Sequence, residues 1–311
     1  MMIKPRALRP GATIGLTAPS GALRPPQTLE PGIRKLESLG YRIVRGKTCD
    51  SAYGYLAGND ALRADELNAM FADPAIDAIW CVRGGYGTIR ILDRLDFDLA
   101  RKNPKPLIGY SDITCLHTAY RQHSGLVTFH GPMLTASPEH DFCDALSFQR
   151  LMDMLCQAAP PETLCPTCPP LASQGGRASG KIIGGNLSLL AAACGTPYAP
   201  DAKDAILFIE EIGEKTYSVD RMLSQLRLSG MLDACAGIVL GGFTDCVAEY
   251  PEYALSLEQI FADILLPAGK PLLSGFSCGH CTPNFPIPLG VECLLDADAS
   301  CLTFLESAVE P

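Results

Sequence analysis

The residue best placed to act as a nucleophile is Ser111, in the stretch KPLIGYSDITCLH (105–117). The short apolar run before it and the helical pattern after it predict a buried strand that turns into a helix at this serine. Such a turn lifts the hydroxyl off the backbone, and the helix N-terminus favours a developing negative charge, as acyl transfer requires. The usual nucleophile elbow has glycine two residues to either side. Gly109 is present, but Ile113 takes the second position, so the alternative that Ser111 only caps the helix stays open.

An activated serine needs a base within hydrogen-bond reach. His280 lies in a glycine-bounded loop, residues 275–284, directly after an apolar strand pattern, where a loop can hold a catalytic group. His130 stands at the end of another expected strand and is a second candidate. Either histidine could instead have a purely structural role, and this alternative is stronger for His130 than for His280. The other histidines follow Ser111 on its helix, pointing away from the turn, or lie in polar segments: His117, His123 and His140.

The base needs a carboxylate to orient it, and the segment FIEEIGE (208–214) ends a buried strand pattern with three of them. Side chains alternate along a strand, so Glu210 and Glu211 must point to opposite faces. One of the two can face the cleft and hold the imidazole, and we expect the other to be solvated. A plain acidic turn is the alternative.

A tetrahedral intermediate needs two hydrogen-bond donors for its oxyanion. The amide of Asp112, directly after the serine, is one candidate. The segment RGGYG (83–87) can supply the other, because its glycines let backbone amides approach a ligand without a Cβ in the way. This loop lacks the lysine and the spacing of nucleotide-binding glycine motifs.

The elements that must position these residues alternate along the chain. Apolar runs predict strands, and patterns with helical spacing separate them, which indicates a parallel sheet with its sites at the carboxyl ends of the strands. A segment rich in Pro, Thr, Ser, Gly and Cys then predicts a domain boundary within 141–180, followed by a second α/β part with a β-rich tail. We predict strands at 12–18, 41–44, 75–82, 106–109, 205–209, 237–243 and 271–275, and helices at 29–39, 61–71, 88–95, 112–122, 146–156, 187–190, 221–227 and 257–265.

A chain of 311 residues with 47% hydrophobic and 19% charged residues can build two domains. The net charge of −9 argues against a nucleic-acid partner or an anionic membrane surface. No apolar run reaches the length of a membrane span, and the N-terminus lacks the apolar segment of a secretory signal, so we expect a soluble, cytoplasmic protein.

The sequence has 14 cysteines, many of them within apolar runs. Without a secretory signal, we expect buried free thiols that behave as small hydrophobic residues. Two CxxC pairs, Cys165/Cys168 and Cys278/Cys281, leave a structural zinc site as an alternative. The first pair lies in a proline-rich loop far from the second in sequence.

Several short motifs, taken together and in order, resemble the microbial L,D-carboxypeptidase family. These are serine peptidases that trim murein tetrapeptides, and the family's other branch is the microcin C immunity protein. The matching stretches cover nearly the whole chain: LRPGATIG (8–15), APSG (18–21), RGGYG (83–87), GYSD (109–112), HGP (130–132), GGNLS (184–188), EEIGE (210–214), DR (220–221), GH (279–280) and PLG (288–290).

The resemblance implies a catalytic triad of Ser111, Glu210 and His280, because the family's acid is the first carboxylate of its pair. It implies an oxyanion hole made by the amides of Gly85 and Asp112, with no metal and no cofactor. Cysteines flank His280 here, which is a departure from the family pattern and leaves the shape of the base loop open.

The same resemblance implies a flavodoxin-like N-terminal domain and a swivelling β/β/α C-terminal domain. We place the first at 1–140, a linker at 141–180 and the second at 181–311. The nucleophile and the base would then come from different domains, with the cleft between them. Family members are commonly dimers, so we expect a homodimer.

Three functions are weighed. The first is an L,D-carboxypeptidase that releases terminal D-alanine from a muropeptide during cell-wall recycling, with Arg83 as a candidate for the terminal carboxylate. The second is an immunity-type enzyme that cleaves peptidyl or aminoacyl nucleotides. That branch needs an aromatic platform for the base, whereas the single tryptophan, Trp80, reads as a buried strand residue. The third is a non-catalytic protein whose glycine loops hold a small acidic ligand.

Overall fold

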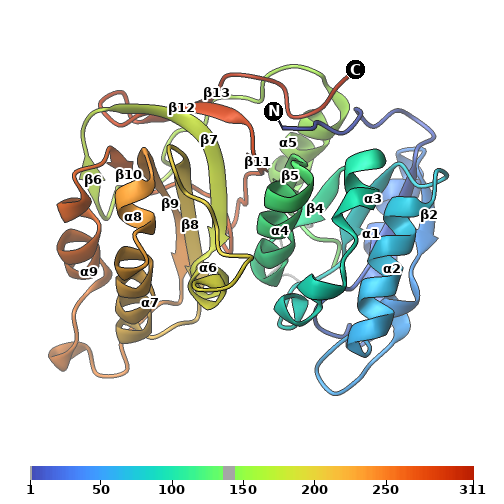
Figure 1. The fold of residues 1–311 in the computed structure, drawn as a ribbon, viewed down its shortest axis with the longest axis horizontal. Helices are drawn as coiled ribbons and strands as arrows, with labels where there is room; N and C mark the ends of the chain where they lie inside the picture. Colours follow the sequence, from blue (N-terminus) through green and yellow to red (C-terminus); the bar gives the residue numbers. More distant parts are fainter. Residues whose placement is uncertain (1, 136–143) are drawn as a thin grey trace.

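The computed structural model describes residues 2–135 and 144–311, and these residues form two sheets side by side (Figure 1). In the first sheet the strands run in the order β2-β1-β3-β4-β5, all parallel, which is the flavodoxin-like order. This confirms the predicted fold class for the N-terminal part. The strands are β1 (Thr13–Thr17), β2 (Arg42–Arg45), β3 (Ala78–Cys81), β4 (Leu107–Gly109) and β5 (Thr128–His130).

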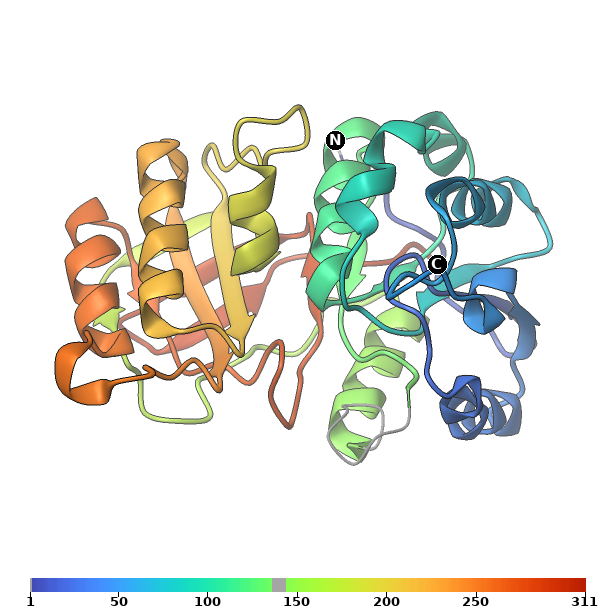
Figure 2. The same ribbon diagram turned by 90° about the horizontal axis from the view of Figure 1, so that it is seen from below.

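Helices cover both faces of this sheet, so its central strands are buried throughout, as parallel sheets require (Figures 1 and 2). The helices over 30–38, 60–72 and 145–156 begin and end within one residue of the predicted bounds. The helix over 114–124 lies two residues later than predicted, and the helix over 97–102 was not predicted. The side chain of Asn59 caps the helix over 60–72 by accepting a hydrogen bond from Leu62 N at 2.8 Å. The helices are α1 (Glu30–Ser38), α2 (Asp60–Ala72), α3 (Phe97–Lys102), α4 (Thr114–Ser124) and α5 (Ala145–Cys156).

The second sheet has the order β13-β12-β7-β8-β9-β10-β6, and its central strands β7 to β10 are parallel. One face of the central strands packs on the helices α6, α7, α8 and α9 (Figure 1). The opposite face of the same strands packs against side chains of β12 and β13, which belong to the same sheet. The strands are β6 (Ser173–Gln174), β7 (Arg177–Asn186), β8 (Ile206–Ile212), β9 (Gly237–Thr244), β10 (Leu272–Leu273), β12 (Glu292–Asp296) and β13 (Cys301–Phe304). The helices are α6 (Leu187–Ala193), α7 (Thr216–Leu228), α8 (Met231–Ala234) and α9 (Leu257–Ile264).

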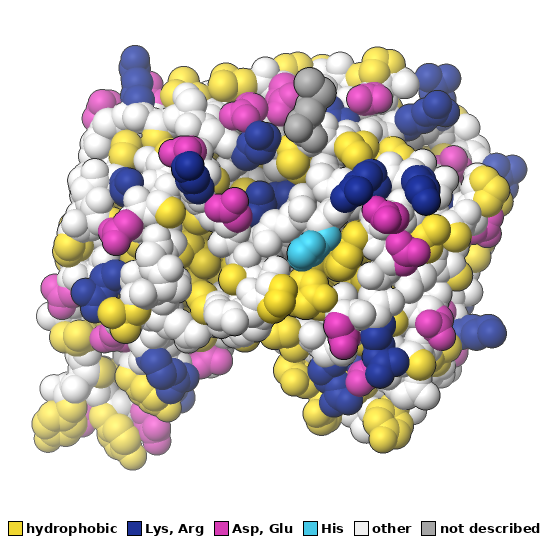
Figure 3. Space-filling model, viewed as in Figure 1, with side chains coloured by type: hydrophobic (Ala, Val, Ile, Leu, Met, Phe, Trp, Pro, Cys, Tyr) yellow, Lys and Arg dark blue, Asp and Glu magenta, His cyan; other side chains and the backbone are white. Residues whose placement is uncertain are grey.

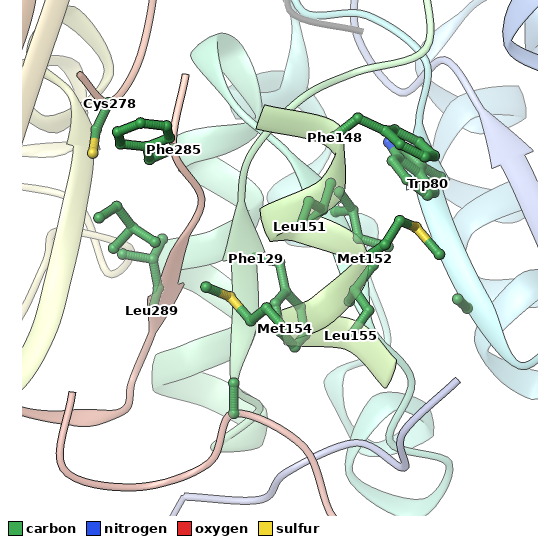
Figure 4. Packing of buried hydrophobic residues seen from close by; sticks show 14 of the residues in the cluster. Trp80, Phe129, Phe148, Leu151, Met152, Met154, Leu155, Cys278, Phe285 and Leu289 are labelled. Atoms are coloured by element: carbon green, nitrogen blue, oxygen red, sulfur yellow. The ribbon is translucent and has the colours of Figure 1, made fainter. Parts of the chain in front are cut away.

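Helix α5 packs on the first sheet with an apolar face (Figure 4). Phe148 stacks on Trp80, with ring centroids 6.4 Å apart, and the indole N–H of Trp80 donates to Pro132 O at 2.9 Å. Trp80 is fully buried, as its sequence context predicts, and its indole N–H has a hydrogen-bond partner.

The C-terminal part of the chain also reaches into the first sheet. Strand β11 (Ile287–Leu289) pairs antiparallel with β5, with Ile287 opposite His130. The C-terminus then returns to the N-terminal half, where Ala7 N donates to Glu310 O at 2.7 Å (Figure 2). The two sheets are therefore joined by a strand as well as by a linker.

Three local predictions change in detail. The segment predicted as a helix at 88–95 is a 3-10 helix, η3 (Thr88–Arg94), which follows Gly87 at a φ of 127°. Helix α7 begins five residues before the predicted start at Arg221. Strand β7 begins at Arg177, inside the segment expected to be linker, because its first residues pair with β12.

Candidate active site

Ser111 lies where β4 ends and opens a 3-10 turn, η4 (Ser111–Ile113), that leads directly into α4. Its φ of 65° is left-handed, a conformation that a non-glycine residue adopts at a cost. No side-chain capping bond is made at this turn. The hydroxyl Oγ instead lies 3.1 Å from Nε2 of His280, so the side chain faces the base and does not cap the helix.

His280 lies in the loop between β10 and β11, 169 positions after Ser111 in the sequence. Its Nδ1 lies 2.7 Å from Oε2 of Glu210, and its backbone N–H donates to the same oxygen at 3.2 Å. Thr244 Oγ1 donates to the carbonyl of His280 from the end of β9. The imidazole is thus held between Ser111 and Glu210 by contacts on both the ring and the backbone.

The base loop approaches Glu210 so closely that a side chain at Gly279 would not fit. A Cβ there would lie 2.5 Å from Oε2 of Glu210. Gly279 also has a φ of 98°, and its N–H donates to Asn284 Oδ1 at 2.8 Å. The glycine before the histidine is therefore required both by its conformation and by the space left for the carboxylate.

Glu210 and Glu211 do point to opposite faces of β8, but the expectation that the second is solvated is wrong. Glu211 is buried and accepts hydrogen bonds from the side chain of Asn186 at 2.9 Å and from the Ser188 hydroxyl at 2.7 Å. The N–H groups of Ser188 and Ile212 donate to it at 2.8 Å each. Burial raises the pKa of Glu211, although these hydrogen bonds act in the opposite direction. Both faces of this strand are covered, which leaves no solvated side for either carboxylate.

The glycine loop after β3 lies directly against Ser111. A Cβ at Gly84 would lie 2.8 Å from Cβ of Ser111 and 3.4 Å from the backbone N of Asp112. Gly85, at a φ of 117°, lines the same small cavity as Ser111 and His280. Both expected oxyanion donors therefore belong to segments that meet at Ser111.

Asp112 is anchored by residues that were not singled out in the sequence. Its Oδ2 accepts from the Ser20 hydroxyl at 2.6 Å and from Thr88 N at 2.8 Å, so the side chain braces the turn from inside. Ser20 belongs to the APSG motif, which was the available signal for this contact. Tyr110 was also missed: its ring centroid lies 4.8 Å from that of His280.

The remaining histidines do not reach Ser111 as partners. His117 is buried on α4, with Nε2 2.8 Å from the carbonyl oxygen of Gly109, and burial lowers its pKa to about 4. His130 is fully buried, its ring packs against Tyr110 and Phe208, and burial lowers its pKa well below the usual value. These two are structural imidazoles. His123 packs against Phe97, and His140 lies outside the described residues.

The cysteines within the described residues are free thiols, and several of them are buried, as expected; Cys143 lies outside those residues. Across the described ranges, no group of three or more His, Cys, Asp or Glu side chains could hold a metal ion. The Cys165–Cys168 loop does approach the base loop, because Thr167 N donates to Gly275 O at 2.8 Å.

Over the described residues, no helix is both long enough and apolar enough to span a membrane. On the face drawn in Figure 3, lysine and arginine are interspersed with aspartate and glutamate and do not gather into a basic patch. The lower edge of that view is indented between the two halves of the molecule.

A serine at a strand-to-helix turn, a histidine beside it and a buried carboxylate behind the histidine are arranged as in serine hydrolases, here on a two-sheet α/β fold. Comparison with known proteins gives the family. Residues 14–131 match the LD-carboxypeptidase N-terminal domain and residues 179–295 match the LD-carboxypeptidase C-terminal domain. The chain belongs to the LD-carboxypeptidase family.

Similar proteins span almost the whole chain. A probable murein peptide carboxypeptidase of Bacillus subtilis is 42% identical, over 94% of this chain and 91% of its own. A murein tetrapeptide carboxypeptidase of Pseudomonas aeruginosa is 34% identical, over 92% and 93%. Among solved structures, MccF in complex with glutamyl sulfamoyl guanosine superposes with a TM-score of 0.88 at 25% identity, over 99% of both chains. The resemblance expected from the sequence motifs is thus confirmed.

Proposed function

We propose that this protein is a serine carboxypeptidase that hydrolyses the amide bond to the terminal D-alanine of a murein tetrapeptide, with Ser111, His280 and Glu210 as its catalytic residues. The observation that carries the proposal is the chain of contacts at the site. Ser111 Oγ lies 3.1 Å from His280 Nε2, and His280 Nδ1 lies 2.7 Å from Glu210 Oε2. These are the distances at which a base can take a proton and a carboxylate can hold that base in one tautomer.

In the proposed reaction, Nδ1–H of His280 donates to Glu210, which leaves Nε2 as the acceptor for the Ser111 proton. The serine oxygen attacks the amide carbonyl, and His280 then returns the proton to the departing amino group of D-alanine. Water hydrolyses the acyl-enzyme with the same histidine as base. The buried Glu210 stabilises the imidazolium that forms in both steps.

We assign the oxyanion hole to the backbone amides of Gly85 and Asp112. Both donors are fixed before substrate arrives: Gly85 by the glycine loop that lies against Ser111, and Asp112 by the bonds from Ser20 and Thr88. Preorganised donors of this kind stabilise the transition state without reorganising during the reaction.

The substrate class is supported by the names of the relatives and by the size of the site. The cavity at Ser111 has a volume of about 150 Å³, below the roughly 300–1,000 Å³ typical of pockets for drug-sized ligands. Such a cavity suits one small terminal residue. The immunity-type alternative calls for an aromatic platform, and Trp80 is buried and unavailable for that purpose.

We further propose that the sequence divides into domains at 1–140 and 181–311, that two copies form a homodimer, and that the enzyme works in the cytoplasm on muropeptides released during cell-wall recycling. The Ser111 side of the site comes from the first sheet and Glu210 from the second, which supports a site between domains.

The test is release of D-alanine from a murein tetrapeptide by the wild type and by Ser111→Ala. We expect release by the wild type and a loss of at least three orders of magnitude in the variant. Release by both would place the nucleophile elsewhere. Release by neither would overturn the proposed substrate, and peptidyl nucleotides would then be the substrates to assay.

A further inference from the structure

A carboxypeptidase must distinguish a chain end from an internal bond, and the chemical mark of the end is its free carboxylate. The cavity at Ser111 contains a positively charged group that can bind a carboxylate. Among the described residues that line it, Arg83 is the only lysine or arginine: Arg83, Gly84, Gly85, Tyr110, Ser111, Met133, Thr135 and His280.

The guanidinium of Arg83 has polar contacts but no counter-charge. Its Nη1 donates to Ala22 O at 2.6 Å and its Nε donates to Gly84 O at 3.2 Å. Both partners are neutral carbonyl oxygens, and within residues 2–135 and 144–311 no carboxylate forms an ion pair with it. Burial lowers the pKa of Arg83, and no neighbouring acid opposes that effect.

Two other arginines of the same half, the buried Arg63 and the half-buried Arg45, have a counter-ion, whereas the half-buried Arg121 has none among the described residues. Arg63 pairs with Asp60 at 2.5 Å, and Arg45 pairs with Glu30 and Asp50 at 2.6 Å each. A protein with 34 acidic residues has ample means to neutralise one more guanidinium. A half-buried charge without a counter-ion is unfavourable by itself, and a ligand carboxylate would relieve it.

The position of the side chain also fits a terminal carboxylate. Nη2 of Arg83 lies 3.6 Å from the place a Cβ on Gly85 would take, and Ser111 Oγ lies 3.0 Å from the corresponding place on Gly84. The cation and the nucleophile therefore flank two adjacent residues of one loop. In a substrate, the attacked carbonyl and the terminal carboxylate are one residue apart, a separation of about 3.8 Å between equivalent backbone atoms.

We propose that Arg83 binds the terminal carboxylate of the substrate and thereby makes this site specific for chain ends; the inference rests on the proposed function. Two of the five N–H groups of the guanidinium are engaged by Ala22 and Gly84. The remaining ones offer a planar fork that can bind a carboxylate through two parallel hydrogen bonds. A lysine at the same place would supply charge without the fork.

The experiment compares a tetrapeptide ending in D-alanine with the same peptide ending in D-alaninamide, by kcat/KM for release of the last residue. Charge-assisted hydrogen bonds of about 1.5–3 kcal/mol correspond to a preference of roughly 10- to 150-fold for the free acid in the wild type. In Arg83→Gln we expect kcat/KM for the acid to fall by that factor, mainly through KM, while the amide is cleaved as by the wild type. Arg83→Lys should keep part of the preference.

Arg90→Gln is the matched control, because Arg90 lies outside the cavity, where it pairs with Asp60 at 2.9 Å. We expect it to leave the acid-to-amide ratio unchanged. Equal losses on both substrates in Arg83→Gln would mean a purely structural role for the arginine and would overturn the inference. So would a wild type that cleaves both peptides equally well.

A second measurement leaves Arg83 intact. The dissociation constants of the two peptides for Ser111→Ala, measured by calorimetry, should favour the free acid by the same roughly 10- to 150-fold factor. Equal affinity for the two peptides would overturn the inference without any question of misfolding. A wild type inactive on both peptides would instead overturn the proposed function, a result distinct from cleavage without discrimination.

Discussion

The side-chain oxygen of Thr114 accepts a hydrogen bond from the backbone N–H of Asn186 at 3.0 Å. Thr114 is the first residue of the helix that follows Ser111, and Asn186 ends β7, opposite Glu210 on β8. The approach is so close that a Cβ on Gly185 would lie 2.5 Å from Thr114 Oγ1. This contact fastens the element carrying Ser111 to the sheet carrying Glu210.

We therefore predict that Thr114→Val lowers both stability and activity, because it leaves a buried N–H without an acceptor. The expected loss in the free energy of unfolding is about 1–3 kcal/mol, measured by urea denaturation. The rate of D-alanine release should fall with it, since the two halves of the site lose a common anchor. Thr114→Ser keeps the hydroxyl and should stay close to the wild type; a valine variant as stable and active as the serine one would contradict the prediction.

Glu210 and Glu211 offer a test in which neighbouring carboxylates give opposite results. Glu210→Gln should reduce kcat by several orders of magnitude with little change in unfolding, because this carboxylate stabilises the charged imidazole. Glu211→Gln should cost about 1–3 kcal/mol of stability, because its amide would face the four donors that now bind the carboxylate. Kinetics and urea denaturation of both variants check this, and a catalytic loss of equal size in the two would count against it.

The backbone conformation at position 111 predicts that serine is not the residue that gives the highest stability there. At a φ of 65°, a glycine is free of the penalty of roughly 1–2 kcal/mol that a residue with a Cβ incurs. Ser111→Gly should therefore be more stable than Ser111→Ala by about 1 kcal/mol, and we expect both to be inactive. Thermal or urea unfolding of the two variants side by side gives the answer, and an alanine variant that is the more stable would refute the argument.

His117 predicts a loss of stability in acid. Burial lowers its pKa from 6.5 to about 4, so the unfolded chain binds a proton that the folded chain does not between these values. The contribution of the neutral His117 to the free energy of unfolding is therefore fully present above pH 6.5 and is lost as the pH falls toward 4. The loss is about 3 kcal/mol, at 1.36 kcal/mol per pH unit. His117→Gln should show a shallower decline than the wild type in urea titrations over this range. Parallel curves would indicate that His117 titrates normally in the folded state.

The catalytic candidates could be found in the sequence because each follows a buried strand, or lies at the end of one, with local glycine signals around it. Ser111 follows an apolar run, Glu210 ends one, and His280 lies in the loop 275–284, directly after Gly279. The alternation of strand and helix patterns predicted that the first sheet is parallel, whereas its flavodoxin-like arrangement was an implication of the family resemblance.

What the sequence could not provide depends on contacts distant along the chain. Glu211 is buried and not solvated as expected. The alternation of side chains along a strand shows that Glu210 and Glu211 point to opposite faces of the sheet, but it does not show that other elements cover both faces. The pairing of β11 with β5 joins residues more than 150 positions apart, and no local pattern marks it. The contact between Thr114 and Asn186 likewise becomes visible only when the two sheets are placed side by side.

Strand β11 has a consequence for the placement of His280. The segment that carries His280 is fastened to β9, where Thr244 binds its carbonyl and Gly242 N donates to Cys278 O at 2.9 Å. Only seven positions later the same segment is a strand of the sheet that carries Ser111, and between them Asn284 N donates to Ser147 Oγ on α5 at 2.7 Å. His280 thus lies on a short segment that is hydrogen-bonded to the second sheet on one side and to the first sheet on the other. The position of the imidazole between Ser111 and Glu210 therefore depends on contacts with both sheets, and not on one of them alone.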